Sequence, residues 1–355
     1  MSGKWVKAGL STASLALAVL LVVFLPQIVH GLTGATVSWG EIGAQFAAMS
    51  VPMVLLMTVL WLASLYAYTF VMTSALPGLT HLQALTLNAA GSAVSNLLPF
   101  GGAAGLALTF GMTKGWGFAT RPVVVYAVVT GVWNTLFRFI LPAIGIIALL
   151  VAGRIPDERV VSAAWGGAVS ILILVAVMAS ALYWERAAAV LGRVLDRVLG
   201  ALPRRIRPAE HAASGAIQRL RTDTAEIVRK GSLGLSLGMV GFLGFQCLIM
   251  TACLVATGAY PGPAETVAVF AVSRVLTSAL ITPSGAGIME GGTASLLIAF
   301  GEPSGSALAA AILFGFWTYT IEIPWGGLAL GGWSLLRRRD AKDRDRRSPE
   351  PATRA

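Results

Sequence analysis

Four charged side chains fall inside hydrophobic stretches of this sequence: Arg138, Arg274, Glu290 and Glu322. A charge near the centre of a lipid bilayer costs at least ~2.5–3.5 kcal/mol, so membrane proteins keep such residues to bind or pair with polar groups. Arg274 and Glu290 flank a segment rich in Pro and Gly that begins at Pro283. The pattern indicates a protein that crosses a membrane several times and handles a polar group at membrane depth.

The segment around Pro283 forms one candidate site with two interpretations. The carboxylate of Glu290 contacts a ligand in a cavity, or it accepts hydrogen bonds from backbone amides that the Gly-rich turn leaves unpaired. Arg274 binds a phosphate through its planar guanidinium, or it pairs with a carboxylate. Ser284 and Gly287 lie between these two charges and complete the candidate lipid-binding set of this segment.

Arg138 and Glu322 occupy matching positions in two similar segments. Trp133–Arg138 aligns with Trp317–Glu322, so the arginine of one segment corresponds to the glutamate of the other. This correspondence predicts a buried ion pair. Such a pair either holds two halves of the protein together or breaks and re-forms during transport. Its presence says little about stability, because desolvation offsets much of the attraction.

Another break in a hydrophobic region, Asn96–Gly102, contributes the remaining candidate residues. Asn96 either contacts a ligand from unwound backbone or caps a helix turn. A helix that starts near Gly101 and Gly102 directs its N-terminal amides into the membrane, where they suit a phosphate. The missing side chains also let a lipid approach the backbone closely.

Composition places these residues in an all-α membrane protein. The chain is 56% hydrophobic and 12% charged, whereas a soluble domain averages about 25% charged residues. A spanning helix needs ~20 predominantly apolar residues. Six stretches of a membrane domain comprising residues 1–336 satisfy this condition: 8–29, 46–72, 122–152, 161–184, 231–257 and 307–334.

Two further hydrophobic regions, 82–112 and 266–300, are too short for two comfortable spans each, and both are interrupted by Pro and Gly. They predict re-entrant helical hairpins, because irregular backbone at membrane depth is tolerated only inside protein or beside a water-filled cavity. The order of spans makes one hairpin enter from each side of the membrane. The sequence therefore predicts an inverted-topology repeat, an architecture that recurs in secondary transporters.

Positive charge predicts the orientation. Lys4 and Lys7, the insert 185–230 and the tail 337–355 carry most basic residues, and all fall on one side of the predicted topology. Basic segments stay in the cytoplasm, so we expect both termini there and a location in a plasma membrane of the bacterial inner-membrane type. The insert and tail attract anionic headgroups. The insert is an interfacial helix pair or a plain connector, and the tail is expected to be disordered.

Other classes of function lack support in the sequence. Cys247 and Cys253 lie in one apolar segment, without neighbouring His, Asp or Glu, so they predict neither a disulfide nor a metal site. His30, His81 and His211 lie at loop edges, and no nucleophile–base pair is apparent. A phosphate-binding Gly-x-x-x-x-Gly-Lys-Ser/Thr loop is absent. We therefore expect no enzyme activity, no cofactor, no ATP hydrolysis by this chain and no nucleic-acid partner.

The two interrupted hairpins carry a family resemblance. Asn96-x-x-Pro-x-Gly-Gly with Gly105, and Arg274 followed by Pro283-Ser-Gly-Ala-Gly-Ile-Met-Glu290, resemble the membrane domain of lysylphosphatidylglycerol synthases, which also occurs alone in a "flippase-like" family. The resemblance covers residues 8 to 335. Gly102-Ala-Ala-Gly105 stands where many members have Gly-Glu and then Arg. If that glutamate contacts a headgroup elsewhere in the family, this chain selects a different substrate.

The resemblance implies translocation of a phospholipid or lipid-linked glycan between leaflets. Synthesis of a lysyl-lipid is not expected, because nothing that resembles the soluble transferase domain follows Arg337. Two alternatives remain open. One is an accessory subunit that presents lipid to a partner enzyme, and the other is an ion-coupled transporter of a small solute. A lipid predicts an opening between helices, and a solute predicts a closed central cavity.

Overall fold

The structure, a computed structural model, describes residue 20 and residues 23–34, 36–97, 101–154, 158–200, 212–277 and 285–347. Within these ranges the regular secondary structure is helical, as expected, and no strand occurs. The helices are α2 Leu25–Thr33, α3 Trp39–Ala47, α4 Val51–Ala75, α5 His81–Leu97, α6 Gly101–Gly115, α7 Thr120–Val151, α8 Glu158–Tyr183, α9 Glu185–Gly200, α10 Ala212–Thr257, α11 Pro263–Leu276, α12 Ile288–Ala299, α13 Ser304–Gly315, the π-helix η2 Phe316–Thr320 and α14 Glu322–Arg347.

Five helical segments are long and apolar enough to cross a membrane. They correspond to five of the six expected stretches; the first, 8–29, lies mostly outside the described residues. The part that is described, α2, packs with α3 against α12 and α13 through Leu25, Val29 and Ile42. The five segments are Val51–Ala75, Thr120–Val151, Val161–Tyr183, Thr224–Thr257 and Ser304–Leu335.

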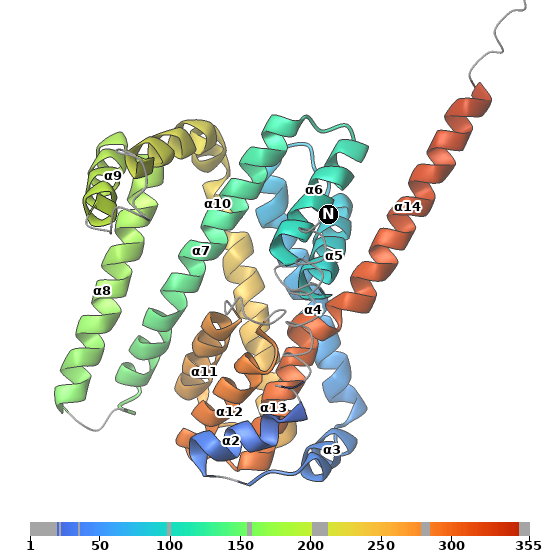
Figure 1. The fold of residues 1–355 in the computed structure, drawn as a ribbon. Coiled ribbons are helices and arrows are strands. Elements are labelled where there is room, and N and C mark those ends of the chain that lie inside the picture. Colours follow the sequence, from blue (N-terminus) through green and yellow to red (C-terminus); the bar gives the residue numbers. More distant parts are fainter. Residues whose placement is uncertain are drawn as a thin grey trace, which may run out of the picture.

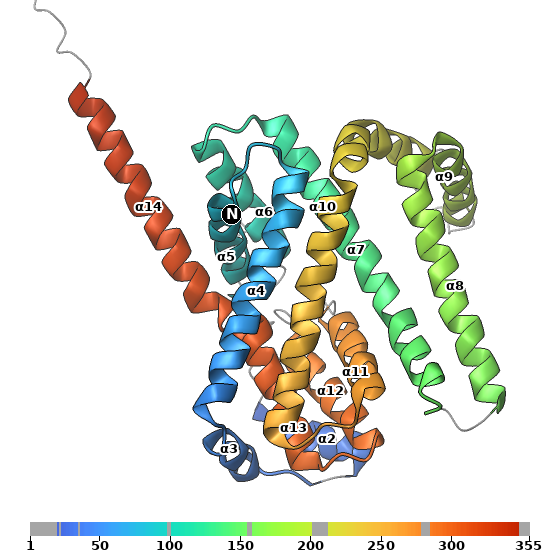
Figure 2. The same cartoon turned by 180° about the vertical axis from the view of Figure 1, so that it is seen from behind.

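Two pairs of shorter helices occupy the two interrupted hydrophobic regions. α5 and α6 have 17 and 15 residues, and α11 and α12 have 14 and 12, all below the ~20 residues that a span needs. Figures 1 and 2 show α5 and α6 in one half of the molecule and α11 and α12 in the other. An inverted repeat of re-entrant hairpins predicts this placement. The breaks themselves, 98–100 and 278–284, lie outside the described residues.

The basic segments lie at one end of the molecule. In both views α9, the first turns of α10, the α6–α7 connection and the end of α14 occupy the same end (Figures 1 and 2). α2, α3, the end of α7, the start of α8 and the α10–α11 connection occupy the opposite end. The described part of the basic insert and the end of α14 therefore lie at one end, whereas Lys4 and Lys7, which also entered the predicted topology, lie outside the described residues.

Two segments differ from their predicted form. The second half of the insert is the beginning of α10, which continues without a break to Thr257. α14 continues to Arg347, which corrects the expectation of disorder for residues 337–347. Extending an existing helix is far easier than nucleating one, and no Pro occurs between Pro324, in the first turn of α14, and Pro349, so the polar tail prolongs the apolar helix.

Glycines let the long helices approach one another closely. A Cβ added to Gly238 of α10 would lie 2.9 Å from the backbone nitrogen of Val71 in α4. One added to Gly145 of α7 would lie 3.1 Å from the Cα of Ala268 in α11, and one added to Gly326 of α14 would collide with backbone of α5. Small residues at helix contacts are a common means of association within membranes.

Candidate functional site

A polar cavity of about 220 Å³ lies between the long helices and the two short pairs. Three of the four charges predicted at membrane depth line it: Arg138 from α7, Arg274 from α11 and Glu322 from α14. Asn96 lines it as well. We call this space the charged chamber; its remaining lining residues are Tyr68, Asn88, Ser92, Asn134, Phe137, Met239, Phe242, Leu243, Gln246, Thr277, Thr318 and Tyr319.

Arg274 has unused hydrogen-bonding capacity. Its side chain is deeply buried, with 9% of the residue exposed, and Nε and Nη1 have no hydrogen-bond partner among the described residues. The positive charge of Arg138 acts on Arg274 unfavourably, and the negative charge of Glu322 acts on it favourably. With two arginines and one carboxylate, the chamber carries a net positive charge, which favours an anion.

Asn96 and Glu322 join the first short pair to α14. The Nδ2 of Asn96 donates to Oε2 of Glu322 at 3.0 Å and to the carbonyl oxygen of Tyr319 at 3.4 Å. Ser92 donates a further hydrogen bond to Glu322. Asn96 is therefore an orienting partner of the carboxylate. The expected contact between Arg138 and Glu322 stays a prediction, although both residues lie in one chamber.

A π-helical turn shapes the wall of the chamber that α14 provides. In η2 the amide of Ile321 donates to the carbonyl of Phe316, five residues back, and the hydroxyl of Thr318 donates to Phe314. The wider turn lies beside Thr318 and Tyr319, which both line the chamber. Single π turns in helices are frequent at functional sites. The sequence carries no local signal for this turn.

Neutral polar residues complete the chamber, and the pattern of charges in the sequence does not predict them. The Nδ2 of Asn134 donates to the hydroxyl of Tyr68 at 2.8 Å. Gln246 is 4% exposed, and its Oε1 has no hydrogen-bond partner in the described part of the chain. An amide side chain in an otherwise apolar span is a detectable signal, because such groups need partners within the membrane.

Glu290 lies outside the lining of the charged chamber and closes its own turn. The residue is 3% exposed, and its Oε2 accepts a hydrogen bond of 2.7 Å from the backbone amide of Gly287. Gly287 has φ +82°, a conformation that favours glycine, and it precedes the first residue of α12. The geometry is that of the capping interpretation. Ser284 lies outside the described residues.

Gly101 and Gly102 begin α6, but neither lines the charged chamber. Gly101 is buried, and a Cβ there would collide with the backbone of Ser95, so this glycine permits the close return of α6 along α5. Gly102 is exposed and faces open space. Neither glycine therefore joins the four predicted residues that do line the chamber, namely Asn96, Arg138, Arg274 and Glu322.

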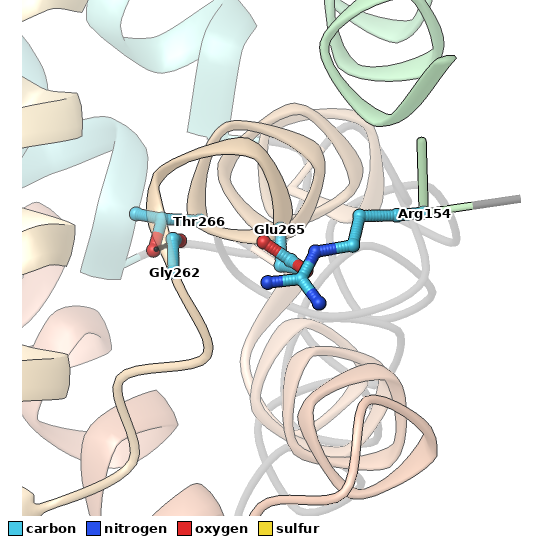
Figure 3. A network of polar contacts seen from close by, with 4 residues as sticks. All are labelled: Arg154, Gly262, Glu265 and Thr266. Atoms are coloured by element: carbon cyan, nitrogen blue, oxygen red, sulfur yellow. Dashed lines mark hydrogen bonds and ion pairs between the residues drawn. The ribbon is translucent and has the colours of Figure 1, made fainter. Parts of the chain in front are cut away.

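One further buried charge, Glu265, was not predicted. Figure 3 shows Glu265 in the first turn of α11 facing Arg154, which follows α7, and the two side chains form an ion pair of 2.5 Å. The side chain of Glu265 is 6% exposed, whereas that of Arg154 is 56% exposed. The Pro- and Gly-containing segment before Glu265, residues 260–263, is typical of an exposed loop and does not predict that Glu265 is buried. The pair ties the start of α11 to the end of α7.

Metal and disulfide chemistry find no support among the residues described. No group of three or more His, Cys, Asp or Glu side chains there is placed to hold a metal ion. Cys247 and Cys253 are free. The charged chamber offers two guanidinium groups, one carboxylate and several neutral hydrogen-bonding side chains.

Comparison with known proteins assigns a family. The family model described as the lysylphosphatidylglycerol synthase TM region matches residues 11–326, which includes both short helix pairs and every residue of the charged chamber. A search of curated proteins gives no match.

Proposed function

Because the chain belongs to the lysylphosphatidylglycerol synthase TM region family, we propose that it moves a lipid between leaflets, with the headgroup phosphate bound in the charged chamber. The single observation that carries this proposal is Arg274, a buried guanidinium facing the chamber with two nitrogen atoms unpaired among described residues. Arg274 interacts with the charge of Glu322, but a buried guanidinium with unmet hydrogen-bond donors is costly unless a ligand meets them.

The chamber fits a phosphate for geometrical and electrostatic reasons. A guanidinium offers a planar set of donors that matches a phosphate, and Arg138 adds a second positive charge. A volume of about 220 Å³ admits a headgroup but not acyl chains. In this proposal the acyl chains of the lipid stay in the bilayer, and the protein performs no enzymatic step.

Glu322 gives the site a means of release. Its negative charge lies in the same chamber as the arginines, where it competes with a bound phosphate for Arg274. A bound anion displaces this interaction, and departure of the anion restores it. Because Glu322 stays in the wall beside the bound phosphate, this competition for Arg274 keeps the phosphate from being bound too tightly to leave.

The topology of the proposed transporter is that of two re-entrant hairpins, α5–α6 and α11–α12, entering from opposite sides of a plasma membrane. The basic end faces the cytoplasm in this orientation. Thr222 lies in the first turns of α10 and Thr36 lies between α2 and α3, and both residues are exposed. Single cysteines at these positions should react with impermeant reagents from opposite sides; labelling of both from one side would contradict the topology.

Translocation of a fluorescent anionic phospholipid in reconstituted vesicles tests the function. Arg274→Gln should lower the rate at least roughly thirtyfold, because truncating one partner of a buried charge pair costs about 2–5 kcal/mol. Arg193→Gln, on the exposed face of α9, is the control and should retain the parent rate. Thermal unfolding checks that both variants are folded. Equal rates for Arg274→Gln and the parent would remove the proposed role of the chamber.

A further inference from the structure

A second cavity adjoins the charged chamber along α5. It has a volume of about 230 Å³ and lies among α4, α5, α6 and α7. Four residues line both cavities, so the two spaces share a wall: Tyr68, Asn88, Ser92 and Asn96. The other lining residues of the second cavity are Met72, Leu87, Gly91, Ser95, Gly105, Thr109 and Tyr126.

The second cavity differs from the first in charge. Its lining, as described, includes no Lys, Arg, His, Asp or Glu, and we call it the neutral chamber. Hydroxyl and amide groups project from four different helices: Tyr68 from α4, Asn88 from α5, Thr109 from α6 and Tyr126 from α7. These groups both donate and accept hydrogen bonds.

The neutral chamber is not explained by packing alone. A polar space inside a membrane domain is expensive to keep unless water or a ligand satisfies its groups. Gly91 lies on the wall of the neutral chamber, and a Cβ added there would meet no atom within 4 Å. An alanine at this position would therefore fit without strain and would make the chamber smaller. The space therefore suits an occupant that forms many neutral hydrogen bonds.

We propose, on the basis of the proposed function, that the lipid carries a neutral hydroxyl-rich group on its phosphate, and that this group occupies the neutral chamber while Arg138 and Arg274 hold the phosphate. A glycerol, inositol or sugar residue has this chemistry, since each hydroxyl both donates and accepts. The shared residues Asn88, Ser92 and Asn96 lie where the phosphate and its substituent join.

The same arrangement disfavours an aminoacylated headgroup. A lysyl group brings ammonium charges, and the residues that line the neutral chamber provide no carboxylate to meet them. Glu322, the one carboxylate of the charged chamber, already accepts hydrogen bonds from Asn96 and Ser92 and interacts with Arg274. Burying an unpaired ammonium costs more than leaving it in water. The substrate of this chain is thus distinct from a lysyl-lipid.

Binding of a lipid series to the full-length protein in detergent, followed by native mass spectrometry, tests the substrate class. The series contains phosphatidylglycerol, phosphatidylinositol, a polyprenyl-phosphate-linked mannose, phosphatidic acid and lysyl-phosphatidylglycerol. At least one polyol-bearing lipid should bind about tenfold more tightly than phosphatidic acid, as expected from one or two added hydrogen bonds. The best binder distinguishes a glycerophospholipid from a polyprenyl carrier.

A double variant, Thr109→Val with Tyr126→Phe, removes two hydroxyls from the neutral chamber. It should eliminate the roughly tenfold preference and leave the affinity for phosphatidic acid unchanged. Thr58→Val is the matched control. Its hydroxyl also donates to the carbonyl four residues earlier, as that of Thr109 does, but this hydrogen bond is exposed on α4 and Thr58 lines neither chamber.

The results separate the two proposals. Equal affinities of the parent protein for phosphatidic acid and every polyol lipid would overturn the substrate class alone, as would tightest binding of lysyl-phosphatidylglycerol. Binding of anionic lipids that Arg274→Gln leaves unchanged would overturn the proposed phosphate site and the substrate class with it. The lipid series on the parent protein requires no variant, so a misfolded variant does not affect the conclusion on substrate class.

Discussion

The two short helix pairs contribute to the molecule in different ways. α5–α6 supplies neutral side chains, among them Asn88 and Asn96, to both chambers. α11–α12 supplies charge, but only Arg274 faces the charged chamber. Glu290 bonds to its own turn at Gly287, and Glu265 bonds to Arg154 on the neighbouring loop.

Burial of a charged side chain in the membrane domain does not by itself define the role of that charge. Glu290 and Arg274 are both almost completely buried and lie in the same helix pair. The carboxylate has a backbone donor at 2.7 Å, whereas two guanidinium nitrogens have no partner among described residues. A buried charge that is satisfied locally stabilises the fold, and one that is not satisfied is available to a ligand.

The attachment of α5 to α14 gives the largest expected effect. Gly326→Val should destabilise the protein by about 3 kcal/mol or more, because the added atoms collide with the backbone of Ala89 rather than with a movable side chain. Gly327 is the adjacent control, since a Cβ there meets nothing within 4 Å. Thermal unfolding in detergent should show a large loss for Gly326→Val alone. Similar losses for both would mean that α5 does not pack on α14 in this way.

The turn before α12 gives a smaller loss of stability. Glu290→Ala leaves the buried amide of Gly287 unpaired, and such a loss costs about 1–3 kcal/mol. Glu290→Gln keeps an acceptor oxygen and should recover part of that stability. Both variants should bind anionic lipid like the parent, after correction for the folded fraction. A stable Glu290→Gln protein that has lost lipid binding would instead make this carboxylate part of the binding site.

The link between α7 and α11 gives the smallest effect. Arg154→Ala should lower stability by about 1 kcal/mol, because the arginine is half exposed and the N-terminus of α11 still stabilises the carboxylate of Glu265. Thermal unfolding at low and high salt measures the effect, and the difference from the parent should shrink in high salt. A loss of several kcal/mol would show that this pair, rather than Glu290, chiefly holds the second helix pair in place.

Most of the fold follows from hydrophobic length. Five spans and two regions of short helices were evident because ~20 apolar residues specify a crossing and Pro or Gly specifies an interruption. The helical continuation to Arg347 was not evident, since composition describes a free segment and ignores the helix that precedes it. The burial of Glu265 was equally hidden, because it depends on the neighbouring α7 and Arg154.

The candidate site was predictable in part. Arg138, Arg274, Glu322 and Asn96 were identified from charge and interruption, and all line the charged chamber. The separation of Glu290 from them depends on the direction of a single carboxylate, which spacing does not determine. The neutral chamber depends on side chains of four helices that meet only in the folded protein.

The lipids that remain bound after purification test the central account most directly. Mass spectrometry of the parent protein should find an anionic lipid enriched over the surrounding membrane composition. Arg274→Gln, if folded, should lose that enrichment, whereas Arg193→Gln should keep it. The same enriched lipid in equal amount on the parent and on Arg274→Gln would contradict the assignment of the charged chamber as the headgroup site.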